Sequence, residues 1–73
     1  MELHGSLVAN LEAAVLSARR LRGRRIYPET LQFWGEVLAK ARDAAGTMVA
    51  PDLFTVAWLA DELEVEIEAH RGP

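Results

Sequence analysis

The segment "DLFTVAWLADELEVEIEAH", residues 52–70, decides how this chain folds. Its apolar residues recur at helical spacing, so we predict a helix over this range. At about 100° per residue they form two stripes on roughly opposite sides of that helix. The first stripe comprises Leu53, Val56, Leu59, Ala60, Leu63 and Ile67, and the second comprises Phe54, Trp58, Val65 and Ala69. Because one small core buries only one face of a helix, the second stripe is predicted to contact another protein surface.

The end of this segment also fits a different structure. In "ELEVEIE", residues 62–68, glutamate alternates with Leu63, Val65 and Ile67, which is the pattern of a half-exposed strand. The sequence therefore leaves residues 62–69 open between helix and strand. Helix is favoured because the preceding residues are helix-periodic and no turn signal separates the two parts. A strand here would imply pairing across a dimer.

Two further helices are predicted upstream. The first covers about residues 6–22, with Ser6 as its N-cap and Gly23 in the left-handed conformation that follows many helices. The second covers about residues 28–45, because Pro28 suits a first helical position and Gly46 ends the apolar periodicity. Trp34 lies on the apolar face of this second helix.

The length of the chain limits its fold to one small domain. With 73 residues, a core rarely supplies more than about 3 to 5 kcal/mol of stability without disulfides, metal or oligomerisation. Cysteine is absent, yet 51% of the residues are hydrophobic. We therefore predict an all-α fold, a three-helix bundle or open helical arrangement completed by homodimerisation. The predicted interface comprises Phe54, Trp58, Val65 and Leu16.

Charge is distributed unevenly along the chain, although the net charge is only −3. A basic patch comprises Arg19, Arg20, Arg22, Arg24 and Arg25, and an acidic patch comprises Asp61, Glu62, Glu64, Glu66 and Glu68. In an up-down-up bundle the first and third helices run parallel, so both patches lie at the same end. We predict that they pair, within one chain or across a dimer, because the acidic patch repels itself along its helix.

Other chemistry finds little support. Glu62, Glu66 and His70 follow one another at intervals of four residues, and carboxylates and imidazoles are side chains that can bind metals. They are nevertheless interpreted as surface residues of the helix, and no metal or cofactor is predicted. A helix-turn-helix is disfavoured because its recognition helix would be acidic and would repel phosphates. No phosphate-binding loop or nucleophile motif is present, so an enzyme is not predicted.

These features predict a small cytoplasmic protein-interaction module, an accessory, adaptor or inhibitor protein that acts through apolar and charged helical surfaces. A homodimer is the expected assembly, and another protein is the second possible partner. The alternative is a nucleic-acid-binding regulator that uses the basic patch between Arg19 and Arg25. This alternative is weaker because Arg19, Arg20 and Arg22 diverge around the helix instead of lining one face. No membrane association is expected.

Overall fold

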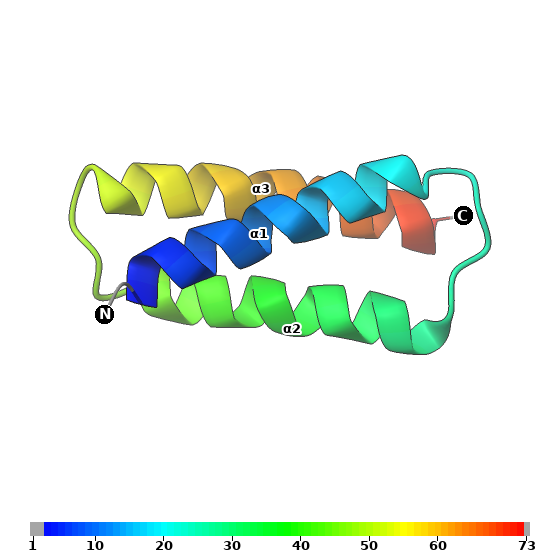
Figure 1. The fold of residues 1–73 in the computed structure, drawn as a ribbon, viewed down its shortest axis with the longest axis horizontal. Coiled ribbons are helices and arrows are strands. Elements are labelled where there is room, and N and C mark those ends of the chain that lie inside the picture. The colour runs from blue at the N-terminus through cyan, green and yellow to red at the C-terminus, as the bar shows by residue number, and fades with distance from the viewer. Residues whose placement is uncertain (1–2, 73) are drawn as a thin grey trace.

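A computed structural model describes residues 3–72, which form three helices: α1 (Leu3–Arg20), α2 (Pro28–Ala45) and α3 (Asp52–Arg71). The predicted all-α fold is confirmed, and residues 3–72 contain no strand. The helices run up, down and up, so α1 and α3 are parallel and their C-terminal ends lie together (Figure 1). The molecule is elongated along the helices, with dimensions of 36 × 22 × 17 Å.

The bounds of α1 differ from the predicted range of residues 6–22. The helix begins at Leu3, so Ser6 lies inside it and the prediction of an N-cap there is wrong. The apolar repeat of Leu7 and Leu11 extends back in the sequence to position 3, which allows the earlier start. At the other end the helix stops at Arg20, followed by a turn in which Gly23 has a φ of 76°. This left-handed conformation, which favours glycine, was predicted for Gly23.

The second helix, α2, occupies the range predicted from Pro28 and Gly46, residues 28–45. Pro28 is its first residue, and the carbonyl of Tyr27 accepts the first backbone hydrogen bond, from the N–H of Thr30 at 3.0 Å. Trp34, Val37 and Ala41 face the core. Phe33, the neighbour of Trp34 in the sequence, is exposed.

Residues 62–69 are helical, so the alternative strand is wrong. The helical conformation places Leu63 and Ile67 on the same side as Val56, where all three are buried. A strand would have pointed Leu63, Val65 and Ile67 to one side together. Burial of two of these residues against α1 and α2 favours the helix, and Val65 remains on the opposite face.

The core lies where α3 packs against both α1 and α2. Its largest fully buried side chains are Leu11 from α1 and Val56, Leu63 and Ile67 from α3. Met48, in the connection between α2 and α3, closes one end of this core. Each helix therefore contributes one apolar stripe to the core. The second apolar stripe of α3 lies outside the core and is exposed.

Candidate protein-interaction site

An exposed apolar face runs along the outside of α3 and continues onto α1. It comprises Phe54, Trp58 and Val65 from α3 and Leu16 from α1, which are 68%, 64%, 60% and 56% exposed. Large apolar side chains are exposed singly on many surfaces, but here three of them share one side of a helix whose opposite side is buried. We call these four residues the apolar face. They are the residues that the sequence singles out as an interface.

A shallow groove of about 380 Å³ joins the two helices at the centre of this face. Leu16 and Trp58 line it together with the acidic and basic side chains of Glu12, Arg19 and Glu62. The floor is formed by the more deeply buried Val15 and Leu59. This combination of an apolar centre and a charged margin is typical of a protein contact surface.

Ion pairs fix both long edges of the apolar face. On the α1 side, Arg19 donates to Glu62. On the α2 side, Arg42 donates to Asp61 at 2.9 Å and also to Glu64. The carboxylates raise the pKa of both arginines above the ordinary value. Each edge of the face thus carries charges that are already paired within the chain.

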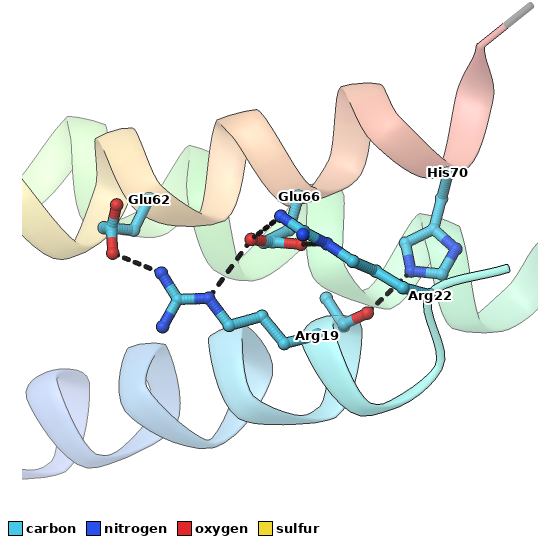
Figure 2. A network of polar contacts seen from close by, with 6 residues as sticks. Arg19, Arg22, Glu62, Glu66 and His70 are labelled. Carbon is cyan, nitrogen blue, oxygen red and sulfur yellow. Dashed lines mark hydrogen bonds and ion pairs between the residues drawn. The ribbon is translucent and has the colours of Figure 1, made fainter.

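Glu66 of α3 is a buried carboxylate that faces the C-terminal end of α1 and is only 2% exposed (Figure 2). Arg22 binds it with two parallel hydrogen bonds, from Nε to Oε1 at 2.8 Å and from Nη2 to Oε2 at 2.7 Å. Arg19 adds a third from Nε to Oε2 at 3.1 Å. The hydrogen bonds from Arg22 and Arg19 lower the pKa of Glu66 against the opposing effect of burial. A fully paired buried charge of this kind ties the end of α1 to α3.

The predicted basic patch is divided in the structure. Arg19 and Arg22 pair with the acidic patch within the chain. Among the residues that the structure describes, Arg20, Arg24 and Arg25 form no ion pair and are exposed. The basic patch therefore has two parts. Arg19 and Arg22 link α1 and the turn after it to α3, whereas Arg20, Arg24 and Arg25 face solvent.

The acidic patch also has partners outside the basic patch. Only Glu62 and Glu66 contact Arg19 or Arg22, whereas Asp61 and Glu64 contact Arg42 of α2, and Glu68 contacts Arg71 at 3.1 Å. These five carboxylates point around more than half of α3, so no single basic block reaches all of them. No direct signal in the sequence marks Arg42, because its spacing from Asp61 becomes meaningful only once α2 and α3 are packed.

His70 does not occupy the surface position predicted for it. The side chain is half-buried, and its Nε2 lies 2.8 Å from the carbonyl oxygen of Ala18 (Figure 2). The centroid of its ring lies 5.0 Å from that of Trp34. The prediction of a surface histidine beside Glu66 is therefore wrong. A histidine four residues after Glu66 points along the same side of α3 toward the core, and this spacing was the only signal in the sequence.

Residues 3–72 contain no cluster of three or more His, Asp or Glu side chains arranged to hold a metal ion. Glu62 and Glu66 instead bind arginines.

Over residues 3–72, no helix combines the length and apolar character that crossing a bilayer requires. No protein-family model, curated protein or solved structure matches the chain, so the side chains and their geometry carry the functional conclusions.

Proposed function

We propose that this chain is a small cytoplasmic protein-interaction module whose contact surface is the apolar face of Leu16, Phe54, Trp58 and Val65. One observation carries the proposal: Trp58 is 64% exposed on the side of α3 that lies opposite its buried stripe. Phe54 lies one turn before it and is exposed as well. Transferring such side chains from water into an interface is the main source of affinity in protein association.

The surroundings of Trp58 favour a protein partner. Tryptophan is enriched among the residues that dominate binding energy, particularly where a ring of other side chains excludes water. Around Trp58 that ring is supplied by Leu16, Glu12 and the paired charges of Arg19 and Glu62. Because Arg19 and Glu62 are already paired with each other, a partner protein can bury the apolar side chains without leaving either charge unpaired.

Site-specific photocrosslinking tests this function. We would replace Trp58 with the photoreactive residue p-benzoylphenylalanine and irradiate cells that express the protein. Phe33 provides a matched control, because it is an aromatic residue of similar exposure, 58%, on α2. We expect protein adducts, with a second copy or with another protein, from position 58 and far fewer from position 33. Equal yields from both positions would reject the apolar face as a contact surface.

Nucleic-acid regulation is the alternative function, and it is supported by three exposed arginines, Arg20, Arg24 and Arg25, with the exposed ring of Tyr27 close to them in sequence. Arg19 and Arg22 weaken this alternative because their charges are engaged by Glu62 and Glu66. Fluorescence anisotropy with a labelled oligonucleotide at low salt tests it. Binding that falls with salt and with the double variant R24A/R25A would support the alternative over protein contact.

A further inference from the structure

The outer side of α1 carries a charge pattern that is complementary to itself. Glu12, Leu16 and Arg20 follow one another at intervals of four residues, and all three are exposed. Among the described residues, neither Glu12 nor Arg20 forms an ion pair. At 1.5 Å per residue, each charge lies about 6 Å along the helix from Leu16, in opposite directions. A second α1 placed antiparallel across Leu16 would therefore set each glutamate against an arginine.

The centre of this pattern coincides with the centre of the apolar face. Leu16 and Trp58 line the same groove, so they lie at the same level along the parallel helices α1 and α3. A two-fold axis passing close to Leu16 would bring the two Trp58 side chains within about one helical turn of each other. The largest exposed apolar side chain of α3 would then lie at the middle of the interface, where binding energy concentrates.

The charge distribution of α3 favours the same orientation. Its C-terminal half carries Asp61, Glu62, Glu64 and Glu68 at or near the surface, whereas the stretch from Leu53 to Ala60 carries no charge. In an antiparallel pair the acidic half of one α3 lies over the uncharged half of the other. A parallel pair would place acidic half against acidic half. The acidic residues closest to the axis, Asp61 and Glu62, are each neutralised by an arginine of their own chain.

The surface area is large enough for such a contact. The chain exposes 5248 Å². A compact monomer of 8.1 kDa is expected to expose roughly 4,500 Å². This excess of about 750 Å² is close to the roughly 800 Å² that each partner contributes to a standard interface. The elongated shape thus leaves an amount of surface that one copy of the chain would cover.

We propose that the occupant of the apolar face is a second copy of this chain, related by a two-fold axis near Leu16 and Trp58, with α1 antiparallel to its counterpart. Two identical ion pairs, each between Glu12 of one copy and Arg20 of the other, fix the register. This inference rests on the proposed function, since it names the partner for the same face.

A charge-exchange experiment tests the register. The variants E12R and R20E each turn both intermolecular ion pairs into repulsive contacts, so each alone is expected to dimerise at least about tenfold more weakly than the native chain. Mixed together, the two variants regain both attractive pairs, so the heterodimer should dominate in native mass spectrometry. The double variant E12R/R20E should dimerise like the native chain. E36R and K40E, which change exposed charges on α2, serve as controls and should leave the dimer unchanged.

The outcomes separate this inference from the proposed function. A native chain that remains monomeric by light scattering up to about 200 μM overturns the inference, and the crosslinking at position 58 then decides whether the face binds another protein. A dimer that is lost in W58A but shows no preference for the mixed pair of charge variants overturns the two-fold register and leaves the face as the interface. A dimer that survives both W58A and L16E places the contact between copies elsewhere and overturns the inference, and the crosslinking at position 58 again decides whether the apolar face binds another protein.

Discussion

His70 Nε2 donates a hydrogen bond to the carbonyl of Ala18 at 2.8 Å, so a side chain near the end of α3 caps the end of α1. The carbonyl needs this donor. The backbone N–H of Arg22, which would continue the helical pattern, instead donates to Arg19, and no backbone N–H of the described residues donates to Ala18. Ala18 is fully buried, so water does not replace the missing donor. With Trp34 against its ring, His70 therefore joins all three helices.

Two substitutions at His70 separate its contributions. His70→Phe keeps an aromatic ring against Trp34 but removes the donor to Ala18, and His70→Ala removes both. We expect H70F to lose about 1 to 2 kcal/mol of unfolding free energy, and H70A to lose about 1 kcal/mol more, as measured by urea denaturation. Equal stability of H70F and the native chain would show that the cap contributes nothing.

Glu66 should be the most sensitive carboxylate of the acidic patch. Glu66→Gln keeps the shape of the side chain but weakens three hydrogen bonds that involve charged groups, so we expect a loss of about 1.5 to 3 kcal/mol. Glu68→Gln is the matched control, because Glu68 forms a single exposed pair with Arg71, and its loss should stay below about 0.5 kcal/mol. Similar losses in both variants would contradict a special role for the buried carboxylate.

The same residue predicts how stability depends on pH. The pKa of Glu66 is lower in the folded chain than its ordinary value of 4.5, chiefly because of Arg22. The unfolded chain therefore takes up the proton first as the solution is acidified. The stabilisation is complete above about pH 4.5 and is lost as the pH falls through the lowered pKa. Denaturation series at pH 7 and at pH 3 should show a smaller acid-induced loss for E66Q than for the native chain, and parallel losses would contradict this assignment.

Burial, and not residue type, should determine the effect of shortening a valine. Val56 is fully buried in the core, whereas Val49 is 77% exposed in the connection between α2 and α3. Val56→Ala removes two buried carbon atoms and leaves a cavity, so we expect a loss of about 2 kcal/mol. Val49→Ala should change stability by less than about 0.5 kcal/mol. Thermal unfolding of the two variants, monitored by circular dichroism, provides the comparison.

Much of the architecture could be predicted because it depends on local patterns. Pro28 and Gly46 bound α2, Gly23 adopts the left-handed turn, and the apolar periodicity of residues 52–70 predicts a helix with two apolar sides. The exposure of Leu16 and Trp58 could also be predicted, because a helix in a core this small has only one side to bury. Glu66 is different, since nothing in its immediate sequence distinguishes it from the neighbouring glutamates.

The sequence by itself determined the three helices, the turn between the first two and the apolar face. Apolar periodicity, and the glycines and prolines that begin or end helices, act over a few residues only. Only the tertiary structure decided which charges pair. Glu66 is buried between Arg19 and Arg22, Arg42 reaches Asp61 across α2 and α3, and His70 caps α1. These contacts join residues 19 to 52 positions apart, and their partners are chosen by the relative rotation and offset of packed helices, which side-chain packing across the core sets.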